Sequence, residues 1–123
     1  MKDPNVSNLF VKIAPPDKKD STVVIFNGEM DKIGLESVRS QVDETIEGLK
    51  TKYLVFDFED LEFINSESIG YLLTVHYRLV KKEKELVLVN VSDHIADVLD
   101  VIGLLQLIKH YKTLKEFEDT LSG

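Results

Sequence analysis

The sequence predicts an α/β domain built on a mixed β-sheet of about five strands, with about four helices packed mainly on one face. Short apolar runs typical of strands alternate along the chain with segments whose apolar residues recur every three or four positions. The first two runs follow each other with no helix between them, so we expect them to pair as antiparallel neighbours. The later strands alternate with helices, which requires parallel pairing through right-handed crossovers.

Five segments are expected as strands: Leu9–Ile13, Thr22–Phe26, Tyr53–Phe58, Leu86–Val89 and a short one around Leu107–Ile108. Pro15 and Pro16 interrupt regular structure between the first two, and Gly28 marks the expected end of the second. The third is nearly continuous in apolar residues, which is typical of a central strand covered on both faces.

Four segments are expected as amphipathic helices. The first has one apolar face made of Leu35, Val38, Val42, Ile46 and Leu49. The second begins near Asn65 or Ser66, ends near Lys82, and has an apolar face made of Ile69, Leu72, Leu73, His76 and Val80. The third begins after Ser92, ends near Gly103, and buries Ile95, Val98, Leu99 and Ile102. The last opens on the capping-box spacing of Thr113 and Glu116 and buries Phe117 and Leu121.

Length and composition indicate one cytoplasmic domain spanning residues 1–123, with its core between about 9 and 120. The absence of cysteine excludes disulfides and thiolate metal sites. The beginning of the chain has no signal-peptide pattern, and no apolar stretch approaches the ~20 residues of a membrane span. A net charge of −7 argues against nucleic-acid binding, because such a surface repels phosphates.

Catalytic patterns are missing from the sequence. The three histidines, His76, His94 and His110, fall in different predicted elements and have no second ligand at metal spacing. There is no glycine-rich phosphate loop and no Gly-x-Ser-x-Gly nucleophile elbow. We therefore expect no enzymatic activity, no catalytic residues, no metal and no cofactor.

The segment Phe63–Gly70 joins a predicted buried strand to a predicted helix. It places Asn65 and Ser66 where the first backbone N–H groups of a helix lack partners. Asn and Ser are preferred at this position as simple caps, so capping alone is one explanation of the pattern. The other explanation is a functional serine.

This segment resembles the phosphorylation loop of the STAS-domain anti-sigma factor antagonists. In that family an apolar residue precedes Asp-Ser-Ser-Gly-Leu-Gly or a near variant, and the first serine is phosphorylated. The matching positions here are, in order, Asn65, Ser66, Glu67, Ser68, Ile69 and Gly70. Two further matches are a Gly-Glu-x-Asp turn after the second strand, here Gly28–Asp31, and the apolar strand Leu54–Phe58. The resemblance extends over residues 9–120.

The resemblance implies a single STAS domain in a bacterial signalling protein that regulates transcription by partner switching. The antagonist would bind an anti-sigma factor that is also a serine kinase, lose this partner when phosphorylated, and be restored by a serine phosphatase. ATP and magnesium would belong to the kinase. Ser66 is the implied phosphorylation site, with Ser68 as the alternative. The expected partner surface comprises Glu29, Asp31, Asn65, Ser66, Glu67 and Ser68, on a monomer or weak dimer.

Two other functions remain open from the sequence. The chain could be a STAS-type interaction module of another signalling or transport complex, without phosphorylation. It could also bind a small nucleotide or lipid in a crevice at the carboxyl ends of the strands.

The segment Gly28–Asp31 is expected to lie near Ser66, because both follow neighbouring strands. An ordinary polar turn is the alternative interpretation. On the first interpretation, reversing the charge of Asp31 weakens partner binding and leaves the melting temperature nearly unchanged.

Overall fold

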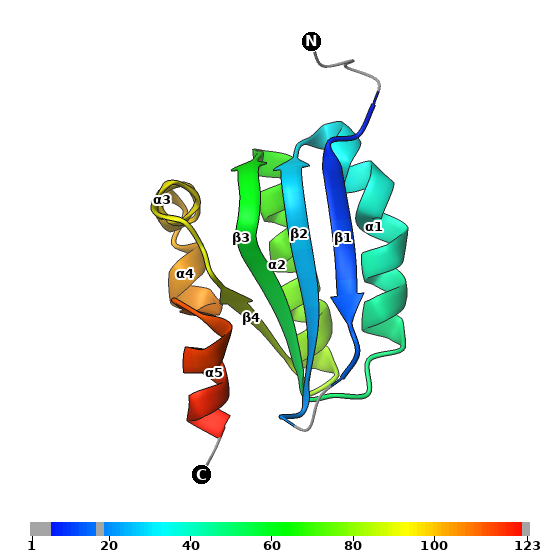
Figure 1. Ribbon diagram of the computed structural model, residues 1–123, viewed down its shortest axis with the longest axis vertical. Helices are drawn as coiled ribbons and strands as arrows, with labels where there is room; N and C mark the ends of the chain where they lie inside the picture. Colours follow the sequence, from blue (N-terminus) through cyan, green and yellow to red (C-terminus); the bar gives the residue numbers. More distant parts are fainter. Residues whose placement is uncertain (1–5, 17–18, 122–123) are drawn as a thin grey trace.

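A five-stranded sheet in the order β1-β2-β3-β4-β5 forms the middle of the structure, a computed structural model that describes residues 6–16 and 19–121 (Figure 1). Its strands are β1 (Leu9–Ala14), β2 (Ser21–Met30), β3 (Tyr53–Ile64), β4 (Glu85–Val89) and β5 (Lys109–Tyr111). The helices are α1 (Lys32–Glu47), α2 (Ser66–Lys81), α3 (Asp93–Val101), α4 (Leu104–Leu107) and α5 (Leu114–Leu121). The pairing of β1 with β2 is antiparallel and the other three pairings are parallel, so the predicted mixed sheet is confirmed.

The core lies mainly between the sheet and one layer of helices. Helices α1 to α4 each bury at least one residue in a cluster with the strands; examples are Leu35, Leu72, Leu99 and Leu104. Helix α5 covers the opposite face, where Phe117 packs with Val23, Val55 and Val87. The prediction of helices mainly on one face is therefore correct, and α5 is the exception.

Strands β2 and β3 continue further than the sequence predicts. The segment Gly28–Met30 belongs to β2, so the expected turn at Gly28–Asp31 is wrong. The strand passes Gly28 because this residue adopts a φ of 118° and because pairing with β3 resumes after two irregularities. A Cβ at this position would lie 1.7 Å from the carbonyl oxygen of Asn8.

The carboxyl-terminal part of the chain contains one more helix than predicted. Residues Leu104–Leu107 form the short helix α4, and the last strand begins only at Lys109. The strand expected around Leu107–Ile108 therefore lies two to three residues later, because Gly103 adopts a left-handed φ of 74° and starts another helical turn.

The buried face of α2 also differs from the predicted one. Of the expected face, Ile69 and Leu72 are buried, whereas Val80 is 51% exposed. The core is filled instead by Val75 and Leu79, which are fully buried. The sequence places apolar residues on two sides of this helix, and their periodicity alone does not show which side is buried.

Replacing Gly28 with alanine should lower the free energy of unfolding by about 2–4 kcal/mol, because the residue adopts a positive φ and touches Asn8. Urea denaturation measures this change. Gly48→Ala is the matched control, since the φ of Gly48 is −94° and an added Cβ would lie 3.5 Å from its nearest neighbour, the carbonyl oxygen of Glu44. We expect a change of at most about 0.5 kcal/mol there, and an equal loss in both variants would contradict the argument.

Candidate functional site at the ends of β2 and β3

Two helices begin side by side where β2 and β3 end (Figure 1). Met30 and Ile64, the last residues of the two strands, are partners in the parallel register. A single residue follows each strand before its helix: Asp31 before α1 and Asn65 before α2. The predicted proximity of the Gly28–Asp31 segment to Ser66 is therefore correct, although the segment is not a turn.

Asp31 is the N-cap of α1. Its backbone is extended, with φ −98° and ψ −170°, and its Oδ1 accepts a hydrogen bond of 2.8 Å from the amide of Gly34. An N-cap aspartate stabilises a helix by roughly 1 kcal/mol. We therefore expect charge reversal at Asp31 to lower stability as well as partner binding, because a lysine at this position cannot accept this bond.

Asn65 is the N-cap of α2. Its side-chain Oδ1 accepts a hydrogen bond of 2.9 Å from the backbone N–H of Ser68. Its backbone N–H donates to the carbonyl oxygen of Met30 at 3.1 Å. The segment expected as a loop is therefore one residue long, since Phe63 and Ile64 belong to β3 and Ser66 is already helical. The capping explanation of Asn65 is correct.

Ser66 and Ser68 lie in opposite surroundings. Ser66 is the first residue of α2 and is exposed. Ser68 is fully buried, and its hydroxyl donates a hydrogen bond of 2.9 Å to the carbonyl oxygen of Met30. A modifying enzyme can therefore reach the side chain of Ser66 on the folded protein. It can reach the hydroxyl of Ser68 only after the start of α2 has unfolded.

Arg39 of α1 brings a positive charge to this site, and no sequence pattern indicated it. Its guanidinium lies 4.0 Å from Oε1 of Glu67 and 3.3 Å from Oε1 of Glu36. The same group stacks 4.9 Å from the ring centre of Tyr71. Because Arg39 is 28 positions before Glu67 in the chain, only the packing of α1 on α2 reveals the contact.

Further along the two helices, hydrogen bonds between polar side chains join α1 to α2. Oδ1 of Asp43 accepts hydrogen bonds from the hydroxyl of Tyr71 at 2.6 Å and from Arg78 at 2.8 Å. Arg78 also donates to Glu47 at 2.7 Å. Burial raises the pKa of the Tyr71 hydroxyl, and the bond to Asp43 raises it further, so Tyr71 stays a neutral donor.

The six residues expected at the partner surface all fall at this end of the sheet. Glu29 pairs with Phe63 in the register, one position before the Met30–Ile64 pair, and its amide donates to the carbonyl oxygen of Asn8 at 3.0 Å. Asp31 and the segment Asn65–Ser68 come directly after the strand ends. Their roles differ: Ser66 and Glu67 are exposed, Asp31 and Asn65 cap helices, and Ser68 is buried.

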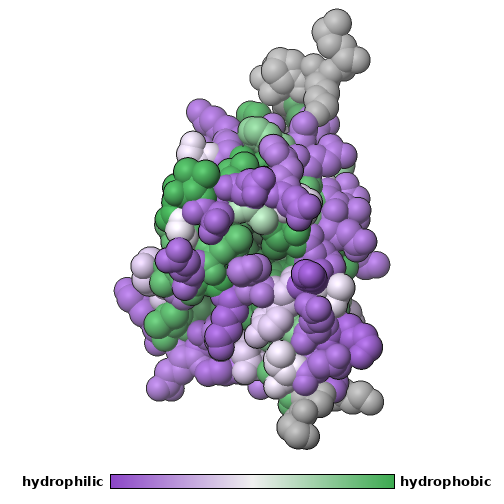
Figure 2. All heavy atoms as spheres, turned by 90° about the vertical axis from the view of Figure 1, so that its left-hand side faces the viewer, coloured by the Kyte–Doolittle hydropathy of each residue, from purple (hydrophilic) through white to green (hydrophobic). Residues whose placement is uncertain are grey.

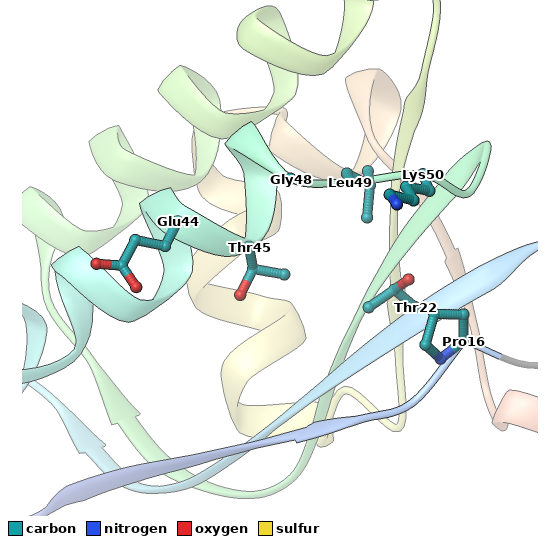
Figure 3. A pocket seen from close by; sticks show the side chains of 7 residues that line it. All are labelled: Pro16, Thr22, Glu44, Thr45, Gly48, Leu49 and Lys50. Atoms are coloured by element: carbon teal, nitrogen blue, oxygen red, sulfur yellow. The ribbon is translucent and has the colours of Figure 1, made fainter.

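A shallow cavity of about 210 Å³ lies at the other end of the sheet (Figure 3). Its lining comes from the end of α1 and the start of β2, and includes Thr22, Glu44, Thr45, Gly48 and Lys50. This position is remote from the carboxyl ends of the parallel strands. A crevice for a small nucleotide or lipid was expected at those ends, if the chain binds such a ligand. The cavity therefore gives that alternative no support.

Within residues 6–16 and 19–121, no three histidine or carboxylate side chains come together as candidate metal ligands. Over the same residues, no helix combines the length and the apolar character that crossing a membrane requires.

Comparison with known proteins identifies the family. The family model of the STAS domain matches residues 12–117. The chain belongs to the STAS domain family. An anti-sigma F factor antagonist from Paenibacillus polymyxa is 27% identical to this STAS domain over 89 residues, which cover 72% of this chain and 76% of that protein.

Solved structures have the same fold. A crystal structure of an anti-sigma factor antagonist from Mycobacterium paratuberculosis superposes with a TM-score of 0.81 at 18% identity, over 100% of both chains. The structure of the Bacillus cell fate determinant SpoIIAA in its phosphorylated form superposes with a TM-score of 0.68 at 19% identity, over 90% of this chain and 99% of that one. At these identities the likeness shows that the STAS domain has the fold of these proteins.

Asn65→Ala should lower the free energy of unfolding by about 1 kcal/mol, because the amide of Ser68 loses its acceptor. Asn65→Asp should be at least as stable as the wild type, since aspartate keeps the cap and its charge suits a helix N-terminus. Urea denaturation at neutral pH compares the two variants. Equal destabilisation by both would show that the cap is not what Asn65 contributes.

Proposed function

We propose that this STAS domain is an anti-sigma factor antagonist that is controlled by phosphorylation of Ser66. The unphosphorylated domain binds an anti-sigma factor that is also a serine kinase, and phosphorylation ends the complex. A serine phosphatase restores the unphosphorylated form. The domain itself acts as ligand and substrate in the bacterial cytoplasm, and the kinase supplies ATP and magnesium.

The position of Ser66 is the observation that carries this proposal. Its side chain is exposed on the first turn of a helix, at the position that matches the family's phosphoserine. The exposed hydroxyl supports Ser66 over Ser68, whose hydroxyl is fully buried and bonded to Met30. The anti-sigma F factor antagonist among the relatives supports the partner class.

The folded domain can accommodate a phosphate at Ser66. Helix geometry leaves the amides of Ser66 and Glu67 without intrahelical acceptors, and a negative group there gains roughly 0.3–1 kcal/mol from the helix dipole. A phosphate adds about −1.5 to −2 charges at pH 7. Glu67 repels it, but the positive charge of Arg39, 4.0 Å from that carboxylate, offsets part of the repulsion.

A bound partner cannot accommodate the same phosphate. Burying a charge of this size without a cationic partner costs several kcal/mol. A micromolar complex has a binding free energy of about −8 kcal/mol, and each 1.4 kcal/mol lost weakens it tenfold. A cost of about 3–4 kcal/mol therefore raises the dissociation constant more than a hundredfold and releases the partner.

Ser66→Ala should fold like the wild type, bind the anti-sigma factor and take up no phosphate from the kinase and ATP. Ser66→Asp should fold but bind more weakly, since one carboxylate imitates a phosphate imperfectly. Ser68→Ala should still be phosphorylated, with stability lowered by about 1 kcal/mol through the lost bond to Met30. Intact mass, phosphosite mapping and calorimetric titration measure these outcomes.

The matched pair Ser66→Ala and Ser68→Ala decides between the two serines. Phosphate uptake that persists in Ser66→Ala and disappears in Ser68→Ala would assign the switch to the buried serine. If the wild type binds partners from native lysate equally with and without ATP and takes up no phosphate, the constitutive interaction module is the correct function instead.

A further inference from the structure

Helix α2 has a second face, free of charged residues, on which four of the five residues are exposed. Its residues recur at steps of four, three, four and three, which places them on one side of the helix; they are Ser66, Gly70, Leu73, Tyr77 and Val80. We call these five residues the outer face of α2. The opposite side of the helix is buried against the sheet and comprises Ser68, Leu72, Val75 and Leu79.

The outer face is uncharged where an exposed helix surface is normally charged. Tyr77 is 54% exposed and Val80 is 51% exposed, while Leu73 is half-buried and packs in part against the core. None of the five residues is charged, in a chain of which 30% of residues are Asp, Glu, Lys or Arg. A contiguous apolar stripe left in water marks an interaction surface more often than a scattered exposed residue does.

Gly70 has no explanation within the fold. It lies inside α2, is exposed, and a Cβ added to it would meet no non-local atom within 4 Å. Glycine inside a helix is less stable than alanine because it loses more backbone freedom on folding. What glycine permits here is close approach of another surface to the backbone, one helical turn from Ser66.

The outer face is continuous with the phosphorylation site. At a rise of 1.5 Å per residue, Gly70 lies about 6 Å, Leu73 about 10 Å and Tyr77 about 16 Å from Ser66 along the axis. An interface of standard size covers about 800 Å² on each partner, which corresponds to a disc of roughly 16 Å radius. An interface of this size that is centred on Ser66 therefore also covers Gly70 and Leu73 and reaches Tyr77.

We propose that the outer face of α2 is the surface on which the anti-sigma factor docks, with Gly70 allowing close contact and Tyr77 serving as the anchor. This inference rests on the proposed function and adds the partner's binding site to it. The partner's complementary surface is apolar and uncharged along a strip about 20 Å long, which is the rise from Ser66 to Val80. A phosphate on Ser66 then places its charge at one end of an uncharged contact.

Another apolar patch provides the matched control. Figure 2 shows apolar residues gathered on the side of the molecule that bears α3 and α4. In this segment Val101 is 86% exposed, and Ile102 and Leu107 are exposed as well. Val101, Ile102 and Leu107 belong to a different segment of the chain from the outer face of α2, so we expect this patch to be separate from the docking surface.

The test measures the affinity of the unphosphorylated full chain for each purified anti-sigma factor serine kinase of the source organism. Tyr77→Ala should raise the dissociation constant about tenfold or more, as truncation of an interface tyrosine commonly does. Gly70→Gln should raise it at least as much while increasing the melting temperature by about 2–5 °C, because glutamine favours helix. Val101→Ser should leave the affinity unchanged.

The combination of higher stability and lower affinity in Gly70→Gln separates a docking role from a structural one. Wild-type affinity in either Gly70→Gln or Tyr77→Ala overturns the outer face as a continuous docking surface, while phosphorylation of Ser66 stands. A loss confined to Val101→Ser overturns it in favour of the α3–α4 patch. If the wild type binds none of these kinases, the proposed function fails and the docking surface fails with it.

Discussion

The carbonyl oxygen of Met30 is the point on which the arrangement of the site depends. It accepts one hydrogen bond from the backbone N–H of Asn65 at 3.1 Å and another from the hydroxyl of Ser68 at 2.9 Å. These bonds tie the first turn of α2 to the end of β2, while the strand register holds Met30 beside Ile64. Ser66 lies between the two tethered residues, so its backbone is fixed and its side chain has only the solvent side to occupy.

The contact between α1 and α2 extends this rigidity over both helices. Asp43 joins Tyr71 and Arg78 through bonds of 2.6 and 2.8 Å, and Arg39 stacks on the ring of the same tyrosine. A surface already ordered in the free protein loses little conformational entropy on binding. A charge added to such a surface is expected to act by electrostatics and desolvation, without requiring a change of fold.

The sequence predicted the sheet, its mixed pairing and four residues of the buried face of α1, because these follow from local periodicity; Leu49, the fifth expected residue, lies beyond the end of the helix. It could not predict that β2 continues past Gly28, since this depends on a positive φ and on contact with Asn8. It identified Asn65 and Ser66 from capping and resemblance, but left Ser68 open, because its acceptor is 38 residues away. Arg39 was missed for the same reason: its contact with Glu67 exists only after two helices pack.

The start of a helix is a suitable place for a reversible charge because it tolerates both states. Without phosphate, Asn65 caps α2 and water can solvate the exposed amides; with phosphate, the dipole and those amides favour the added charge. Under the proposed switch, a phosphate on Ser66 would change the stability of the free domain little, and the cost would fall on the complex, where the charge would be desolvated. Glu67 increases the difference between the free domain and the complex. Its carboxylate lies beside Ser66 and repels a phosphate there, and this repulsion is stronger where the phosphate is removed from water.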